Sequence, residues 1–453
     1  MPNLVVVKYG GSLLSSADAF RTAASYVVGK STDGSRAVVL VSAMSGLTNR
    51  FMDIYDRRAL QELSAIENIY WEVAKPLPKR HHDQAMEEIK EEMKALKILL
   101  EARNKDAFVG SAEGHSAILQ KYHILAQDRD AAHLSGADAG FLLNAHGLID
   151  MEASRVNLRE RVGGLLSKGI PVVGGYLGRH HKTDAYQLGA RNSNDGFAAA
   201  LAVALGAQAV EIVKDVPGVF RVYPREDLGI LRKLSYNEAG NMSWTGSPVV
   251  HPSAIIISES SGLPIVVKNM QSDGTVISTE TETTKEKFVA SVVPERTFMV
   301  TIRDRMIGTY EGMGYWSIIS SFEEGRGNAI TPVSAMGGIS YTLNIDDRKK
   351  AGDNETLFRN HIEELRAHLN ANGFRASVVG DEVGRITLVG DAMQSRQGTF
   401  YYLTGILSER GISLRSTVQI DEKVMPPVIS IVVDSDNLES TTTALTEELF
   451  TVR

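Results

Sequence analysis

The chain has 453 residues, of which 43% are hydrophobic and 23% charged, a formal net charge of -7 at pH 7, and no cysteine. Single hydrophobic cores stop growing at roughly 250 to 300 residues, so we expect two or three domains. The lack of cysteine excludes disulfides, thiolate catalysis and cysteine-bound zinc, and the negative charge argues against nucleic acid as the main partner. We find no signal-peptide pattern and no run of about 20 apolar residues, and therefore expect a cytoplasmic protein that does not enter a membrane.

Strands that end in glycine-containing loops recur along the first half of the chain. The first strand is LVVV at 4–7, which runs into the loop KYGGS at 8–12, and a helix is expected from about residue 17. Further apolar runs of this kind lie at 37–44, 170–178 and 209–220. Continuous apolar strands that alternate with helices are typical of a parallel sheet covered by helices on both faces.

The remaining segments predict helices and then a second kind of fold. Residues 58–105 are rich in Glu, Lys, Ala and Leu, and indicate a pair of helices broken near Pro76 and Pro78. Near residue 271 the composition turns to Ser, Thr and Glu, which indicates a linker. Two weakly similar units follow, each with a strand, a glycine-marked turn, a helix and further strand. Such a duplication suggests small regulatory modules.

The loop KYGGS at 8–12 is the strongest chemical signal in the chain. Two glycines at the mouth of a helix let backbone N–H groups approach an anion, although a glycine turn between strand and helix is also common without one. In a doubly wound sheet the carboxyl ends of the strands line one crevice, so Lys8, Ser42, Gly175 and Asp215 are expected to face one site. Neither GxxxxGK[ST] nor GxGxxG occurs, which excludes a P-loop and leaves no dinucleotide fingerprint.

These loops form an ordered series that resembles the aspartate kinases of the amino-acid kinase superfamily over essentially the whole chain. KYGGSLL resembles the family's KFGGTSV, VVLVSAMSGLTN is nearly identical to its second loop, and GYLG is similar to its GFxG segment. The series continues with SAEGHSA at 111–117, LGARNSND at 188–195 and VKDVPGVFRVYPR at 213–225. The resemblance implies an amino-acid-kinase α/β domain at 1–285, a mostly parallel sheet sandwiched by helices. Two α+β ACT (ferredoxin-like) modules are expected to follow at 286–380 and 381–453, with room for the last strand pairings to cross between the modules.

The resemblance also implies an activity, which is the ATP-dependent phosphorylation of the side-chain carboxylate of L-aspartate to give 4-phospho-L-aspartate. This is the first step of aspartate-family amino acid biosynthesis. A carboxylate nucleophile is already ionised at neutral pH, so no general base is required. Mg²⁺ would bind to the phosphates, and no residue is predicted as a metal ligand. The resemblance further implies an amino-acid effector at the ACT modules and a homodimer or higher homo-oligomer.

Roles carry over to the matching positions. Lys8 and Asp195 are the implied catalytic residues. The implied substrate-binding residues are Ser42, Thr48, Glu113, Arg191 and Asn194. The implied nucleotide-binding residues are Lys8, Gly10, Gly11, Ser12, Lys214, Asp215, Phe220 and Arg225.

The chain departs from the family pattern mainly around the site. LGARNSND has one residue more than the family's LGRGGSD, and Asn192 and Ser193 replace its two glycines. This loop motivates one alternative, a kinase for another amino acid or small carboxylate. Tyr223 replaces an acid and Pro248 replaces a lysine, which motivates a second alternative, a degenerate kinase that serves as an ACT-type amino-acid sensor.

Simpler interpretations stand beside several of these roles. Arg191 and Asp195 have the spacing of an (i, i+4) salt bridge, and Glu113 has the pattern of a surface carboxylate on a helix. The adjacent His180 and His181 suggest a solvated turn more than a metal site. His251, which precedes a proline, is expected to cap or support the start of a helix.

Overall fold

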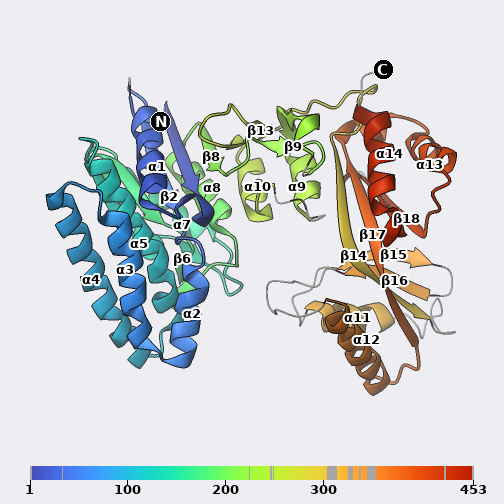
Figure 1. Ribbon diagram of the computed structural model, residues 1–453, viewed down its shortest axis with the longest axis horizontal. Helices are drawn as coiled ribbons and strands as arrows, with labels where there is room; N and C mark the ends of the chain where they lie inside the picture. Colours follow the sequence, from blue (N-terminus) through green and yellow to red (C-terminus); the bar gives the residue numbers. More distant parts are fainter. Residues whose placement is uncertain are drawn as a thin grey trace. The chain divides into compact units, whose positions relative to one another are not determined.

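The computed structural model describes residues 3–32, 34–223, 225–244, 247, 249–303, 314–324, 330–335, 338–343, 354–422 and 425–450. The chain divides into two compact units (Figure 1). The first comprises Met1–Val219, Ile230–Trp244 and Pro248–Glu282, and the second comprises Phe220–Gly229, Thr245–Ser247 and Thr283–Arg453. The finer division of the C-terminal region at residue 380 stays a prediction.

In the described part of the chain, the first unit is built on an eight-stranded sheet in the order β11-β13-β12-β8-β1-β2-β5-β3. Its strands are β1 (Leu4–Tyr9), β2 (Arg36–Val41), β3 (Ala131–Leu134), β5 (Ile170–Gly174), β8 (Ala209–Val213), β11 (Lys233–Ser235), β12 (Ile265–Lys268) and β13 (Thr275–Ser278). Neighbouring strands are parallel, except that β12 and β13 are antiparallel. The parallel sheet that the apolar runs predict is therefore present.

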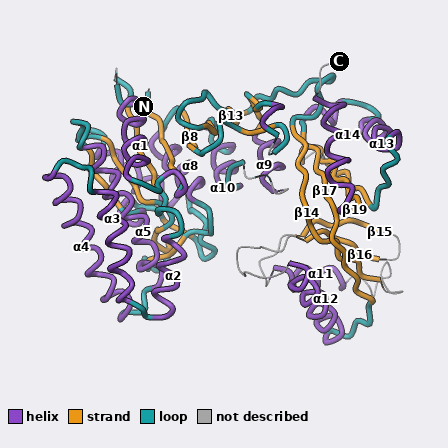
Figure 2. The backbone as a smooth tube through the Cα atoms, in the orientation of Figure 1, coloured by secondary structure: helices purple, strands orange, loops and turns teal. Residues whose placement is uncertain are grey.

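Helices cover both faces of this sheet. One face carries α1 (Ala17–Lys30), α2 (Leu47–Arg57), α3 (Leu63–Ala74), α4 (Lys79–Glu101) and α5 (Lys105–Leu125), whose apolar side chains share a core with alternate residues of β1 and β2 (Figure 2). The other helices of the unit are α6 (Gly136–Ala139), α7 (Met151–Leu165), α8 (Asn194–Leu205), α9 (Tyr236–Trp244) and α10 (Pro252–Glu259). Helix α8 packs on β1 between α7 and α10, and its apolar sequence NDGFAAALAVAL suits a helix buried all round.

Local sequence explains where several of these helices begin and end. The predicted break near Pro76 and Pro78 is confirmed, because α3 ends at Ala74 and Pro78 directly precedes α4. Asn104 caps α5 by accepting a hydrogen bond from the backbone N–H of Ala107 at 3.1 Å. Short strands complete the unit's edges: β4 (Leu142–Leu143), β6 (Leu177–His180) and β7 (Tyr186–Leu188) form one small sheet, and β9 (Val219–Phe220) and β10 (Ile230–Leu231) form a ribbon.

In the described part of the second unit, six antiparallel strands form one sheet in the order β15-β16-β14-β17-β19-β18. The strands are β14 (Ser291–Arg303), β15 (Ile330–Ala335), β16 (Gly338–Leu343), β17 (Ser377–Val389), β18 (Ser416–Glu422) and β19 (Met425–Asp434). The helices are α11 (Gly314–Glu324), α12 (Asn354–Ala371), α13 (Thr399–Glu409) and α14 (Leu438–Phe450). No helix in the described ranges is long and apolar enough to cross a membrane.

The sheet of the second unit supports two separate cores. The α11–α12 core contains Val300 of β14 and Val378 of β17, whereas the α13–α14 core contains Val292 of β14 and Ile386 of β17. Because β14 and β17 pair over their full lengths, each strand contributes one half to each core. Val222 is also part of the α13–α14 core, which explains why the segment Phe220–Gly229 groups with this unit.

Truncation of one buried residue tests the α13–α14 core. Leu403 is 0% exposed, whereas Tyr401, two residues earlier on α13, is 84% exposed. We expect Leu403→Ala to lower the free energy of unfolding by about 2–5 kcal/mol, because it leaves a cavity. Tyr401→Ala is the control, with an expected change within about 0.5 kcal/mol. The measurement is chemical denaturation of both variants, and equal shifts would contradict this packing.

Candidate active site

The predicted site residues gather at one edge of the first unit's sheet. Strands β5, β2, β1 and β8 are neighbours in that order and run parallel, so their carboxyl ends meet at this edge. Lys8 lies near the end of β1, in register with Leu40 of β2 and Ile212 of β8. Ser42 follows β2, Gly175 follows β5, and Lys214 and Asp215 follow β8. This is the crevice where ligands of open α/β sheets bind.

Lys8 and Asp195 form a buried ion pair at this edge. The Nζ of Lys8 lies 2.8 Å from Oδ1 of Asp195, and the backbone N–H of His251 donates to Oδ2 at 3.1 Å. Burial would raise the pKa of Asp195, but the positive charges of Lys8 and Lys214 outweigh it and hold this pKa below its ordinary value. Asp195 is therefore an anion that fixes the position of Lys8, and it pairs with Lys8 instead of with Arg191.

The glycine loop lies against the loop after β2. Gly10 precedes a short 3-10 helix at Gly11–Leu13, and Ser12 is exposed. A Cβ at Gly11 would lie 2.5 Å from the backbone oxygen of Ala43, so only glycine fits there. A Cβ at Gly10 would lie 3.7 Å from Nζ of Lys8, which places the lysine's ammonium group beside the loop. This arrangement of cation and glycine loop suits an anion.

Ser42 and Asn194 contact each other across the site. The side-chain amide of Asn194 donates to Oγ of Ser42 at 2.9 Å, while its Oδ1 is buried without a hydrogen-bond partner in the structure. A Cβ at Gly175 would lie 2.2 Å from that same Oδ1, so the glycine leaves room for the amide. The absence of a side chain at Gly175 therefore makes room for the amide of Asn194.

Glu113 is buried and incompletely satisfied. It lies on α5 with 3% exposure, and its Oε2 has no hydrogen-bond partner in the structure. Burial raises the pKa of its carboxyl group to about 8, although hydrogen bonds with the backbone of Ala43 and of Glu113 itself act in the opposite direction. The interpretation of Glu113 as a surface carboxylate is therefore wrong. A buried acceptor of this kind suits a cationic ligand group.

Arg191 contacts the first half of α2, the helix that carries Thr48. Arg191 is exposed, and its Nη2 lies 3.4 Å from Oδ1 of Asn49 and 3.5 Å from the sulfur of Met52. Thr48 is half-buried in the first turn of the same helix. The loop that carries Arg191 turns at Asn192, whose φ is 63°. Asparagine tolerates this left-handed conformation better than most residues.

The predicted nucleotide residues divide between the two units. Lys214 is half-buried and donates to the backbone oxygen of Val249, and burial lowers its pKa despite the charge of Asp195. Asp215 is exposed beside it. Phe220 and Arg225 group with the second unit, where Phe220 is buried and Arg225 pairs with Asp227 at 2.8 and 2.7 Å. Their nucleotide role stays a prediction, and Pro248 lies outside the described residues.

The histidines have structural partners. His251 caps α10, because its ring accepts a hydrogen bond from the backbone N–H of Ser253 at 3.3 Å, as its position before Pro252 predicts. His181 lies 2.7 Å from Asp150, and the ring of His180 accepts from the backbone of the turn that follows. Among the described residues, no group of three or more His, Cys, Asp or Glu side chains could hold a metal ion.

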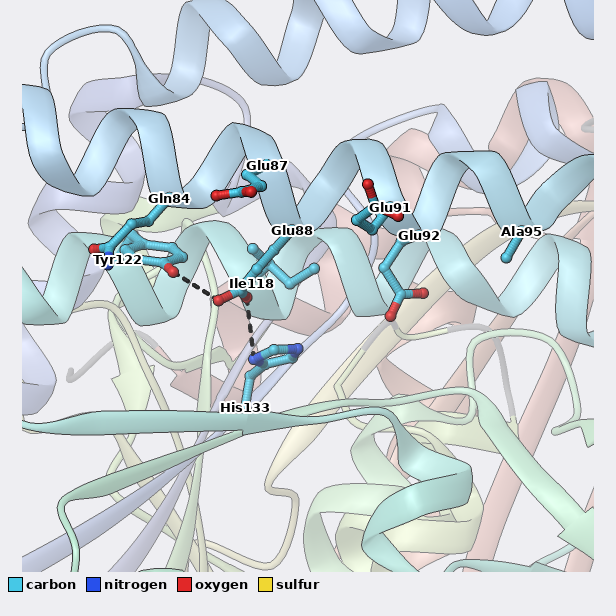
Figure 3. Close-up of a pocket in the computed structure, with 9 residues that line it drawn as sticks. All are labelled: Gln84, Glu87, Glu88, Glu91, Glu92, Ala95, Ile118, Tyr122 and His133. Carbon is cyan, nitrogen blue, oxygen red and sulfur yellow. Dashed lines mark hydrogen bonds and ion pairs between the residues drawn. The ribbon is translucent and has the colours of Figure 1, made fainter.

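A separate acidic cavity of about 620 Å³ lies between α4, α5 and β3 (Figure 3). Glu88 is at its centre, where the hydroxyl of Tyr122 donates to it at 2.6 Å and Nζ of Lys121 lies 2.6 Å away. His133 points at the same carboxylate from β3. None of the predicted site residues lines this cavity.

Sequence reasoning did not assign a role to Tyr176, the residue that follows Gly175. Tyr176 is 7% exposed and has a φ of 62°. A left-handed conformation in a bulky residue costs about 1–3 kcal/mol and persists only where the surroundings impose it, often at functional sites. The tyrosine directly after two glycines was visible in the sequence, but nothing there showed its conformation.

Comparison with known proteins agrees with this geometry. Residues 3–269 match the model of the amino acid kinase family, and the chain belongs to that family. It is 25% identical to aspartokinase 2, chloroplastic, of Arabidopsis thaliana, over 98% of this chain and 84% of that protein.

Two crystal structures of E. coli aspartokinase III resemble the fold. The complex with lysine and aspartate has a TM-score of 0.81 at 20% identity, over 99% of this chain and all of that one. The complex with aspartate and ADP has a TM-score of 0.77, also at 20% identity, over 99% of this chain and 100% of that one. The predicted fold class, a parallel sheet with helices followed by ACT-like antiparallel modules, is confirmed.

The pH dependence of stability tests the state of Glu113. Its pKa is raised in the folded chain, so the protonated form is favoured and its contribution to stability is fully present below about pH 4.5 and lost as the pH rises through about 8. We expect the free energy of unfolding of the wild type, minus that of Glu113→Gln, to fall across this interval without any ligand. The measurement is chemical denaturation at several pH values; a flat difference would show that folding does not raise the pKa of Glu113.

Proposed function

We propose that this chain is an aspartate kinase, which transfers the γ-phosphoryl group of ATP to the side-chain carboxylate of L-aspartate. The observation that carries the proposal is the buried Lys8–Asp195 pair, which holds an ammonium group beside a glycine loop at the carboxyl edge of the sheet. Similarity to an aspartokinase over 98% of the chain supports the choice of substrate.

The chemistry requires that two anions meet. An oxygen of the substrate carboxylate attacks the γ-phosphorus, the bond to the bridging oxygen breaks, and ADP leaves with the electron pair. Lys8 stabilises the charge on the transferring group, and because Asp195 already fixes Lys8, little reorganisation is needed. The N–H groups of Gly10 and Gly11 would bind phosphate oxygens, and no proton has to be removed from the nucleophile.

The remaining polar groups of the site suit the α-ammonium and α-carboxylate groups of the substrate. Glu113 binds the α-ammonium group, which supplies the partner that its buried Oε2 lacks. Arg191 binds the α-carboxylate, and Ser42, Thr48 and Asn194 contact the substrate between these ends and Lys8. The E. coli enzyme with the same fold is described in complex with aspartate and ADP, which is in keeping with such a site.

Mg²⁺ is expected with the nucleotide. Mg²⁺ usually keeps several waters and binds through substrate phosphates with one or two carboxylates, and Asp215 is an exposed carboxylate at the end of β8. When bound, the ion neutralises charge on the β- and γ-phosphates. Lys214, beside Asp215, would contribute a second positive charge.

The second unit is proposed to regulate the first. Its two ACT-like cores are of the kind that binds an amino-acid effector, and the E. coli structure of the same fold is described in complex with lysine. We also propose that the chain forms a homodimer or a higher homo-oligomer. Which amino acid serves as effector is a question for the titration of activity with candidate end products.

A substrate panel tests the proposed function. ADP release is measured with Mg-ATP and each of aspartate, glutamate, asparagine and small carboxylic acids. We expect turnover with aspartate to exceed that with every other acid. If another acid is turned over and aspartate is not, the substrate assignment is wrong. If none is turned over and calorimetry detects no binding of Mg-ATP, the chain is a sensor and not a kinase.

Replacement of Lys8 tests its catalytic role. We expect Lys8→Ala to lower kcat by at least about 10²–10³-fold, because it removes preorganised charge stabilisation. Lys30→Ala is the matched control: Lys30 lies 2.6 Å from the buried Glu211, so it also breaks an ion pair with a buried carboxylate but lies outside the site. Circular dichroism checks that both variants fold. Equal loss of activity in the two variants would mean that the effect comes from stability.

A further inference from the structure

The turn that carries Tyr176 connects the two sides of the proposed substrate site. A Cβ at Gly174 would lie 3.0 Å from the backbone of Glu113, and one at Gly175 would clash with Asn194. The carbonyl of Tyr176 accepts a hydrogen bond from the N–H of Gly189 at 2.7 Å, which ties the turn to the loop that carries Arg191. The turn thus holds Tyr176 between Glu113, proposed to bind the α-ammonium group, and the loop of Arg191, proposed to bind the α-carboxylate.

The charges of Glu113, Arg191 and Asp106 act on the phenol group of Tyr176. Burial raises the pKa of Tyr176, the negative charges of Glu113 and Asp106 raise it further, and the positive charge of Arg191 acts in the opposite direction. The hydroxyl therefore keeps its proton at neutral pH and is available as a hydrogen-bond donor. The segment GYLG carries this hydroxyl where the similar GFxG segment has a phenylalanine.

We propose that Tyr176 is a specificity-determining residue whose hydroxyl donates a hydrogen bond to the α-carboxylate of the bound amino acid. The proposal rests on the proposed function and adds a residue to it. A neutral donor suits the carboxylate better than the ammonium group, for which Glu113 already supplies the acceptor. Arg191 is exposed, and within the described ranges its guanidinium group hydrogen-bonds to Asn49 and Met52 at 3.4 and 3.5 Å, so its contact with a carboxylate would be open to solvent.

The chain gains a buried donor in the same site where its arginine loop is unusual. The loop LGARNSND is one residue longer than the family pattern and turns through Asn192 in a left-handed conformation. The hydroxyl of Tyr176 supplies a fixed contact that does not depend on the path of this loop. A site that hydrogen-bonds a substrate group discriminates strongly against analogues that lack the group.

The variant Tyr176→Phe removes the hydroxyl alone and keeps the ring that fills the turn. We expect KM for aspartate to rise on the order of tenfold, as for the loss of a hydrogen bond to a charged group, with kcat and KM for ATP within about twofold. Tyr186→Phe is the matched control, because Tyr186 lies on the neighbouring strand β7 with its ring under Arg179 and outside the site. An unchanged KM for aspartate in Tyr176→Phe overturns the proposal.

A substrate analogue identifies the group that the hydroxyl contacts. Aspartate α-amide lacks the α-carboxylate, and calorimetry without ATP measures the dissociation constants of both aspartate and the α-amide in the absence of phosphoryl transfer. We expect Tyr176→Phe to weaken aspartate about tenfold and the α-amide less than threefold. Equal weakening of both ligands overturns the assignment to the α-carboxylate. Turnover of aspartate by the wild type separates these outcomes from a failure of the proposed function itself.

Discussion

The first unit's site depends on the buried ion pair between Lys8 and Asp195. A buried carboxylate or ammonium group is unfavourable unless it is closely paired, and Asp195 and Lys8 meet this condition with each other. Asp195 lies in the first turn of α8, where the helix dipole favours an anion, and it also accepts the N–H of His251 before α10. The pair therefore fixes β1, α8 and α10 relative to one another, and displacing any one of them would leave an uncompensated charge.

Much of this arrangement could be predicted from local sequence. The glycine loop around Lys8, the helix break at Pro78 and the cap at His251 each depend on a few adjacent residues with strong conformational preferences. The ordered motifs then indicated the family and the fold. The structure brings Lys8 and Ser42 to one sheet edge because the parallel strands β1 and β2 end on the same side. Asn194 of α8 reaches this edge through its hydrogen bond to Ser42, and Glu113 of α5 through the backbone of Ala43.

Other features depend on packing between distant segments and could not be predicted in this way. The simpler interpretation of Arg191 and Asp195 as an (i, i+4) salt bridge is wrong, because a turn at Asn192 separates them, Arg191 contacts Asn49 and Asp195 pairs with Lys8. The strands β14 and β17 each contribute to both cores, which depends on pairing between segments that lie far apart in the sequence. For the same reason Val222 packs in the second unit, although its motif predicted a place with the nucleotide loops.

If Glu113 binds the substrate's ammonium group, as we propose, its burial would link substrate binding to proton release. Near neutral pH this group is largely protonated in the free enzyme, since its pKa is about 8, yet it must be ionised to pair with an ammonium group. Binding of the amino acid would then release protons into the solvent. The apparent binding enthalpy would consequently vary with the ionisation enthalpy of the buffer, and cellular acidification would weaken substrate capture without touching the phosphoryl-transfer machinery.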